Sequence, residues 1–298
     1  MAAWMPSAAP VTTSAMASGT TWTTCLPNMG SSEHPVDPGI RAEIDARLAG
    51  IEAEFDVRVL YACESGSRGW GFASPDSDYD VRFIYVHPLS WYLKVSAQRD
   101  VIEVPISGEL DINGWELRKA LGLLKKGNAT LIEWLDSPVV YRADGDFLQA
   151  IRDAARQTHQ AERSFHHYVH MARKNYREYL RGDTVRLKKY LYVLRPLLAT
   201  LWIEQGHGVA PMRFQDLVDA IVTDPNLRDA LDQLLAVKRA AWEAEYGQPL
   251  PIINAFIDSE LTRLESVLPP LPRDTDFAVL DRLLMNTVLR MDSRGAGR

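Results

Sequence analysis

The chain changes character near residue 143, and this change limits the folds that it can adopt. Before that point, apolar runs at 57–63 and 80–86 indicate buried strands, and a third strand is expected between 101 and 112. From residue 146 onward the apolar spacing is helical almost throughout, with glycines and prolines as breaks. Strands early in the chain and helices afterwards predict an α+β fold built from two units.

The expected domain boundaries follow from these patterns. Residues 1–36 are rich in Ala, Ser, Thr, Gly and Pro without a period of 2 or 3.6, so we expect a disordered leader. Asp37-Pro38 then supplies a helix N-cap followed by proline at the first helical position. Residues 37–142 are expected to form a small α/β domain with a short mixed sheet, and residues 143–298 an all-helical domain. The helices of the second domain are expected at 146–181, 184–205, 213–223, 226–246, 252–267 and 275–291.

Composition excludes several classes of protein. The 33 basic residues stand against 39 acidic ones, and the net charge of −6 argues against non-specific coating of nucleic acid. Cys25 and Cys63 are the only cysteines, too few for a disulfide framework or a thiolate zinc site. No apolar run approaches the roughly 18 residues that span a bilayer, and the N-terminal stretch lacks the charged and apolar regions of a signal peptide. We therefore expect a cytoplasmic protein without a membrane partner.

A cluster of carboxylates marks the candidate site. Asp78 and Asp80 are two residues apart at the start of a strand, so their side chains are expected on the same face. Two adjacent anions repel each other unless a cation lies between them, and hard oxygen ligands suit Mg²⁺ or Mn²⁺. Asp111 follows on the next strand and is the favoured third carboxylate, with Glu109 second; Glu103 lies in the same region, but Pro105 and Gly108 leave the register open.

The loop before these carboxylates has the composition of a phosphate-binding turn. Gly66-Ser67 leaves the first strand, where a turn exposes backbone N–H groups and a hydroxyl to phosphate oxygens. Strand, phosphate loop and carboxylate pair within fifteen residues predict a site for a nucleotide and a metal ion.

The chain resembles the polymerase-beta-type nucleotidyltransferase superfamily. The motifs that carry the resemblance are, in chain order, Gly66-Ser67, Ser77-Asp78-Tyr79-Asp80 and Asp111. Within this superfamily, the chain is similar to the family predicted to act in RNA repair. The similar stretches are GSRGWGFASPDSDYDVRFIYV, DINGWELRK, NATLIEWL and KKYLYVLRPLLA. The resemblance covers roughly residues 50–205 and implies a nucleotidyltransferase domain. It implies further that Asp78 and Asp80 hold two metal ions and that Asp111 ligates one of them and activates the acceptor hydroxyl. The loop of Gly66 and Ser67, with Arg68 beside it, would hold the nucleotide phosphates.

A basic face is expected on the helical domain. Residues 151–200 hold eleven Arg and Lys against four Asp and Glu. One predicted helix has basic and histidine residues on one face and aromatic residues on the opposite face. The basic and histidine residues are Arg163, His167, His170, Lys174, Arg177 and Arg181. His166, His167 and His170 lack a cysteine or carboxylate nearby, which disfavours a zinc site.

The next helix repeats this scheme, with Lys188, Tyr192 and Arg195 in one stripe backed by leucines. We expect Lys188 and Arg195 to contact the triphosphate and Tyr192 to stack on a base or sugar. Pro196 lies inside this helix and removes one amide donor, which should free the carbonyl of Tyr192.

These observations predict a metal-dependent nucleotidyltransferase that transfers a nucleoside monophosphate from a nucleoside triphosphate to a hydroxyl acceptor, with Mg²⁺ or Mn²⁺ as cofactor. The acceptor stays open between an RNA end and a hydroxyl of a protein or small molecule. A non-catalytic nucleotide- or RNA-binding module is the alternative of a different class.

Overall fold

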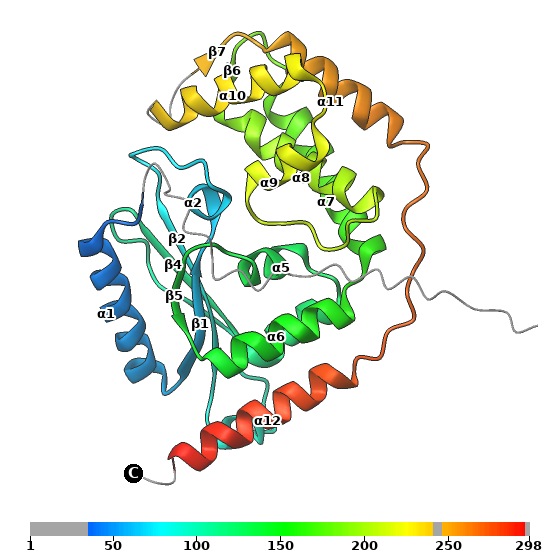
Figure 1. The fold of residues 1–298 in the computed structure, drawn as a ribbon. Coiled ribbons are helices and arrows are strands. Elements are labelled where there is room, and N and C mark those ends of the chain that lie inside the picture. Colours follow the sequence, from blue (N-terminus) through cyan, green and yellow to red (C-terminus); the bar gives the residue numbers. More distant parts are fainter. Residues whose placement is uncertain (1–34, 241–245, 296–298) are drawn as a thin grey trace, which may run out of the picture.

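The computed structural model describes residues 35–240 and 246–295, so residues 1–34 of the expected leader lie outside the described part. The described chain has an α+β fold around a mixed five-stranded sheet of order β3-β4-β2-β1-β5, which confirms the predicted fold class (Figure 1). Strands β2 and β4 are parallel and the other pairs antiparallel. The strands are β1 (Arg58–Glu64), β2 (Tyr79–Val86), β3 (Val101–Glu103), β4 (Leu110–Glu116) and β5 (Val140–Ala143).

Helices cover both faces of this sheet. On one face lies α1 (Pro38–Phe55), which begins at the predicted N-cap: the Asp37 carboxylate accepts hydrogen bonds from the next free amides. Its buried residues Ile44, Leu48 and Ile51 pack against the strands. The other face is covered by α4 (Leu117–Lys125), α5 (Ala129–Leu135) and α6 (Gly145–Thr158), and two short helices, α2 (Gly66–Trp70) and α3 (Leu89–Tyr92), follow β1 and β2.

The expected third strand is in fact two strands. The chain reverses at Gly108, whose φ of +61° suits glycine, so β3 and β4 pair antiparallel. Asn113 is of a residue type common at helix N-caps, but α4 begins only at Leu117, because pairing with β2 keeps the chain extended up to Glu116. The side chain of Glu116, rather than that of Asn113, caps the helix.

A bundle of helices lies above the sheet in Figure 1. It contains α7 (Ala161–Tyr179), α8 (Lys188–Glu204), α9 (Phe214–Ile221), α10 (Pro225–Ala240) and α11 (Pro251–Arg263), with a small two-stranded sheet of β6 (Val185–Arg186) and β7 (Tyr246–Gly247). The helix expected at 146–181 is broken near His159 into α6 and α7, and the strand pair β6 and β7 was not expected. Pro196 frees the carbonyl of Tyr192 as predicted, and the side-chain amide of Asn175 donates to it at 2.9 Å.

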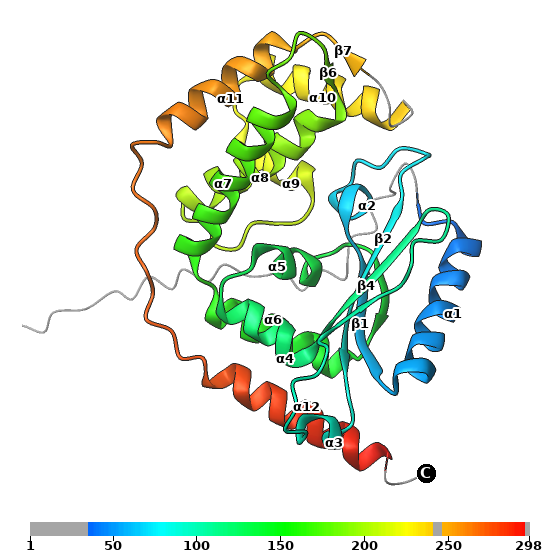
Figure 2. The same ribbon diagram turned by 180° about the vertical axis from the view of Figure 1, so that it is seen from behind.

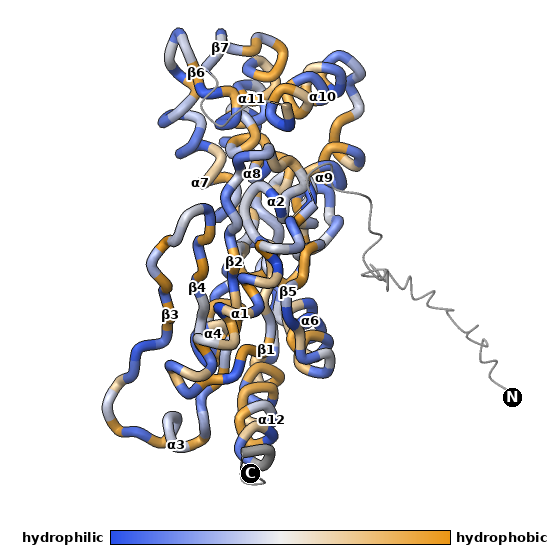
Figure 3. Tube along the Cα trace, turned by 90° about the vertical axis from the view of Figure 1, so that its left-hand side faces the viewer, coloured by the Kyte–Doolittle hydropathy of each residue, from blue (hydrophilic) through white to orange (hydrophobic). Residues whose placement is uncertain are grey.

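The hydrophobic clusters divide the chain differently from the boundary expected at residue 143. Phe147 and Ile151 of α6 pack on the sheet together with Leu280 and Val288 of the last helix, α12 (Ala278–Gly295). Figure 2 shows α12 beside α4 and α6, far from α10 and α11, and hydrophobic positions recur along it in Figure 3. The chain thus returns to the sheet after leaving the bundle. Among the described residues, no helix is both long and apolar enough to cross a membrane.

Candidate active site

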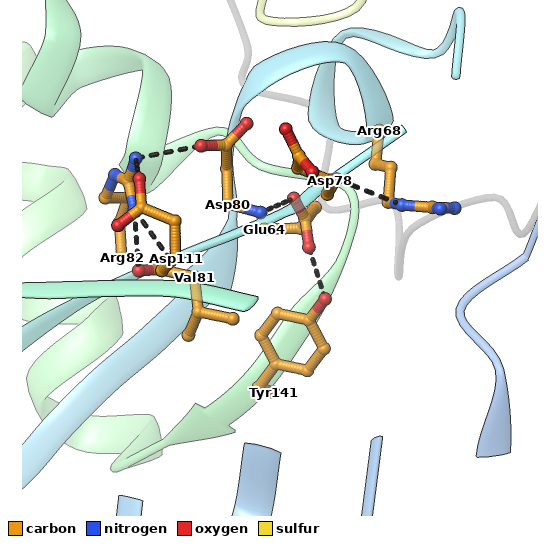
Figure 4. A network of polar contacts seen from close by, with 8 residues as sticks. All are labelled: Glu64, Arg68, Asp78, Asp80, Val81, Arg82, Asp111 and Tyr141. Carbon is orange, nitrogen blue, oxygen red and sulfur yellow. Dashed lines mark hydrogen bonds and ion pairs between the residues drawn. The ribbon is translucent and has the colours of Figure 1, made fainter. Parts of the chain in front are cut away.

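Two of the predicted carboxylates face each other across neighbouring strands. Asp80 of β2 and Asp111 of β4 are register partners in the parallel pair, and both alternate with buried apolar residues. One nitrogen of Arg82, Nη2, lies 2.9 Å from Asp80 Oδ1 and 2.7 Å from Asp111 Oδ2 (Figure 4). The same guanidinium donates through Nη1 to the carbonyls of Val81 at 3.1 Å and Asp111 at 2.9 Å. Asp111, and not Glu109 or Glu103, is therefore the strand partner of Asp80.

Asp78 lies just before β2, and its side chain is exposed. Figure 4 shows its carboxyl group on the same side of the strand as that of Asp80. Burial raises the pKa of Asp80, and the negative charges of Asp111 and Asp78 raise it further, while Arg82 acts in the opposite direction. The three predicted carboxylates therefore share one electrostatic environment.

The site fits a shared cation, although the side chains do not form a complete ligand set. In the described ranges, no three His, Cys, Asp or Glu side chains converge as metal ligands. Arg82 Nη2 nevertheless shows that one positive group can contact Asp80 and Asp111 at the same time. Mg²⁺ commonly binds through one or two carboxylates and completes its shell with water and phosphate oxygens.

The predicted phosphate loop passes directly against these carboxylates. Gly66 has a φ of +56°, and a Cβ atom at this position would lie only 2.0 Å from Asp80 Oδ2. The amide of Ser65 donates to the carbonyl of Asp80 at 2.8 Å, which fixes the start of the loop to β2. Ser67 follows in the first turn of α2 and is buried. Glycine is required at 66 both by its conformation and by the close approach.

Arg68, predicted to hold the nucleotide phosphates, points away from the Asp80 and Asp111 carboxylates in Figure 4. Its guanidinium is buried and donates to the carbonyls of Ser77 at 2.7 Å and Asp78 at 3.3 Å. It also lies 3.9 Å from the ring centre of Tyr79. Arg68 therefore supports the segment that carries Asp78, because the folded loop turns the side chain inward.

Besides Arg82, the supporting residues Glu64, Tyr141 and Lys238 were not predicted from the sequence. Glu64, at the end of β1, accepts a hydrogen bond from the Asp80 amide at 2.8 Å and another from the Tyr141 hydroxyl. Burial raises the pKa of Glu64 to about 7, against the effect of these hydrogen bonds. Lys238 of α10 donates to the hydroxyls of Ser74 and Ser77 at 2.5 and 3.3 Å. A carboxylate ending an apolar strand was a usable signal for Glu64, whereas nothing local in the sequence connects Lys238 to the loop.

The stripe predicted on the second helix is not a continuous exposed face. Arg195 is only 2% exposed; its Nη1 lies 2.7 Å from Glu133 Oε1, and its Nε donates to the carbonyl of Met212. The prediction that Arg195 reaches the triphosphate is wrong, because α8 is packed on nearly all sides by the bundle and by α5. Lys188 and Tyr192 are half-buried, and the Tyr192 ring contacts Trp70 of α2 with centroids 5.4 Å apart.

The stripe predicted on α7 agrees better with the structure. Its aromatic face is buried as expected, with Phe165, Tyr168 and Tyr176 in the core of the bundle. Of the six predicted basic and histidine residues, Arg163, His170, Lys174 and Arg177 are exposed and His167 is half-buried, while the exposed Arg181 lies beyond the end of α7. Tyr179, at the end of the aromatic face of α7, is half-buried.

Comparison with known proteins found a matching family model, a related sequence and a similar solved structure. A family model described as RlaP, the RNA repair pathway DNA polymerase beta family, matches residues 40–286. The chain is 43% identical over 251 residues to "Uncharacterized protein YcgL" of Bacillus subtilis (strain 168), covering 84% of this chain and 96% of that protein. A solved structure of a nucleotidyltransferase-like protein from Exiguobacterium sibiricum 255-15 is similar over 83% of this chain and 76% of that chain, with 15% identity and a TM-score of 0.29.

Proposed function

The chain belongs to the RNA repair pathway DNA polymerase beta family, and from this premise we propose that it is a metal-dependent nucleotidyltransferase. It would transfer a nucleoside monophosphate from a nucleoside triphosphate to a hydroxyl group. The observation that carries the proposal is the pairing of Asp80 with Asp111 in register on parallel strands, with one cationic nitrogen shared between them.

Asp78, Asp80 and Asp111 would hold Mg²⁺ or Mn²⁺ in this proposal. The bound metal ions would neutralise phosphate charge and stabilise the attacking and leaving oxygens at the α-phosphate. Asp111, on the strand beside Asp80, would accept the proton of the attacking hydroxyl as general base. The raised pKa of Asp80 supports a site that gains from a cation, since burial and neighbouring anions both oppose its ionisation.

The nucleotide would be held from two sides. The loop of Gly66 and Ser67 would offer backbone N–H groups to the phosphates, and its contact with Asp80 keeps phosphate and carboxylates together. Lys188 and Tyr192 would approach from α8; the contact of Tyr192 with Trp70, at the end of α2, supports this placement. Positioning and charge neutralisation carry most of the rate in phosphoryl transfer.

We propose an RNA end as the acceptor. The family description supports it, and so does the exposed basic face of α7. The net charge of −6 favours a short contact at an end over a long footprint, because each phosphate contact calls for a cation. The cytoplasm is the compartment that this substrate suggests.

The experiment is transfer of label from α-labelled nucleoside triphosphates, tested one base at a time with Mg²⁺ or Mn²⁺. RNA with a 3′-hydroxyl is compared with the same RNA carrying a 3′-phosphate, which blocks the terminal 3′-hydroxyl. We expect label on the hydroxyl-ended RNA alone, and none with the Asp78→Asn/Asp80→Asn protein. Label on a protein or small molecule would change the acceptor, and no transfer to any hydroxyl would refute the proposed function.

A further inference from the structure

Arg82 lies where the proposed reaction needs a metal ion. Its Nη2 atom contacts Asp80 Oδ1 at 2.9 Å and Asp111 Oδ2 at 2.7 Å, and all three side chains are mostly shielded from solvent. Strand geometry produces this arrangement: Arg82 is two residues from Asp80 on the same face of β2, and Asp111 is the register partner of Asp80. The arginine is therefore built into the carboxylate pair.

We propose that Arg82 is the resident counter-cation of Asp80 and Asp111, and that it must release both carboxylates before Mg²⁺ or Mn²⁺ binds to them. The inference rests on the proposed function, since it concerns the same carboxylates. A divalent cation and a guanidinium nitrogen cannot occupy the same place between two oxygens, and the two positive charges repel each other. Metal and Arg82 therefore compete for one site.

The orientation of the carboxylates supports this competition. The Oδ1 atom of Asp80 is turned to Arg82, while its Oδ2 atom lies against Gly66 of the phosphate loop. The Oδ2 atom of Asp111 likewise accepts a hydrogen bond from the guanidinium. Asp80 Oδ1 and Asp111 Oδ2 are therefore both occupied by Arg82 and not open to a metal ion in this arrangement.

The release would be a local movement. Arg82 Nη1 is held separately, by the backbone carbonyls of Val81 and Asp111 at 3.1 and 2.9 Å. The guanidinium can thus give up the two carboxylates at Nη2 and keep its backbone partners, so the strands stay paired. In the metal-free protein Arg82 also limits the repulsion between two anions that face each other across the sheet.

The test is calorimetric titration of the full-length, metal-free protein with MnCl₂ and, separately, MgCl₂. We expect Arg82→Gln to bind Mn²⁺ at least about tenfold more tightly than the unchanged protein, since one charge-assisted competitor is removed. Arg82→Lys is expected between the two, because an ammonium cannot bridge both carboxylates and both carbonyls. In melting experiments without metal, Arg82→Gln should melt at a lower temperature, and added Mn²⁺ should raise its midpoint more than that of the unchanged protein.

Arg142→Gln is the matched control. Arg142 lies in the same sheet, is similarly shielded and pairs with Glu52 at 2.9 Å, but it contacts none of the three carboxylates. We expect its affinity for Mn²⁺ to be unchanged. Unchanged or weaker Mn²⁺ binding by folded Arg82→Gln, or by Arg82→Lys if the glutamine variant does not fold, would overturn the inference.

These outcomes separate the inference from the proposed function. Equal metal binding with and without Arg82, together with nucleotidyl transfer, removes only the role of Arg82. Absence of Mn²⁺ binding in the unchanged protein and in both variants overturns the role of Arg82 directly, and the transfer assay then decides the function on its own.

Discussion

The guanidinium of Arg195 and the carboxylate of Glu133 form a buried ion pair, 2.7 Å from Nη1 to Oε1, between α8 and α5. The hydroxyl of Tyr168 donates to the same carboxylate oxygen at 2.8 Å, so the Glu133 carboxylate of α5 binds side chains from both α7 and α8. The Arg195 guanidinium carbon also lies 5.0 Å from the ring centre of Trp70, the last residue of α2. The helical bundle is thereby joined to the layer of helices on the sheet and to the loop beside the carboxylates.

Breaking this pair should destabilise the fold. We expect Arg195→Met to lower the free energy of unfolding by roughly 3–5 kcal/mol, because it leaves the Glu133 carboxylate buried without its cation. Urea denaturation measures the change. Arg99→Met, which removes an exposed pair with Glu103, should cost less than about 1 kcal/mol. Adding Glu133→Leu to Arg195→Met should recover part of the loss, and a double variant no more stable than the single one would contradict the argument.

Two alanine variants separate the effect of the close contact between Gly66 and Asp80 from the effect of the positive φ at Gly66. Gly66→Ala and Gly71→Ala both place alanine at positive φ, +56° and +86°, and this backbone conformation alone should cost each variant about 1–2 kcal/mol of stability. Only Gly66→Ala pushes a methyl group against Asp80; at Gly71 the space is open. We therefore expect turnover to be lost in Gly66→Ala and kept in Gly71→Ala. Equal turnover in the two variants would show that the contact with Asp80 does not matter.

Asp111 and Glu109 were both candidates for the third carboxylate, and the structure separates them. Glu109 is exposed and its backbone carbonyl accepts a hydrogen bond from the Tyr79 amide at the start of β2, whereas Asp111 is the register partner of Asp80. Asp111→Asn should reduce nucleotidyl transfer by at least about 100-fold, as expected for loss of a general base. Glu109→Gln should leave transfer within about twofold of the unchanged protein, as expected for a surface position. Steady-state kinetics decides, and similar losses in both would remove Asp111 from its proposed role.

Stability should fall in mild acid because of His159. Burial, with the nearby charge of Arg273, lowers the pKa of His159 to about 4, below the value of about 6.5 in an unfolded chain. Between these two values the unfolded chain binds a proton that the folded protein does not, so the free energy of unfolding decreases as the pH falls.

His159→Gln removes this titration. The loss of stability between pH 7 and pH 5 should therefore be smaller in the variant by roughly 1.5 kcal/mol, measured by urea denaturation at both pH values. His170→Gln, at an exposed position of α7, should follow the unchanged protein. An identical loss in His159→Gln and the unchanged protein would show that His159 is not held neutral by burial.

Local patterns predicted the features that depend on neighbours in the chain. The cap at Asp37, the aromatic face of α7 and the carbonyl freed by Pro196 each follow from spacing within a few residues. Arg82 could also have been found, because strand alternation places it beside Asp80.

The sequence by itself determined the fold class, the start of β2 at the carboxylate pair and the glycine loop before it, because strand and turn preferences are local. Only the tertiary structure decided that Arg195 is buried against Glu133, since α8 is enclosed by helices far away in sequence. It likewise decided that Asp111 is the partner of Asp80, because the register of two parallel strands depends on pairing across the sheet. The return of α12 to the sheet has the same origin: an apolar helix face does not specify which surface buries it.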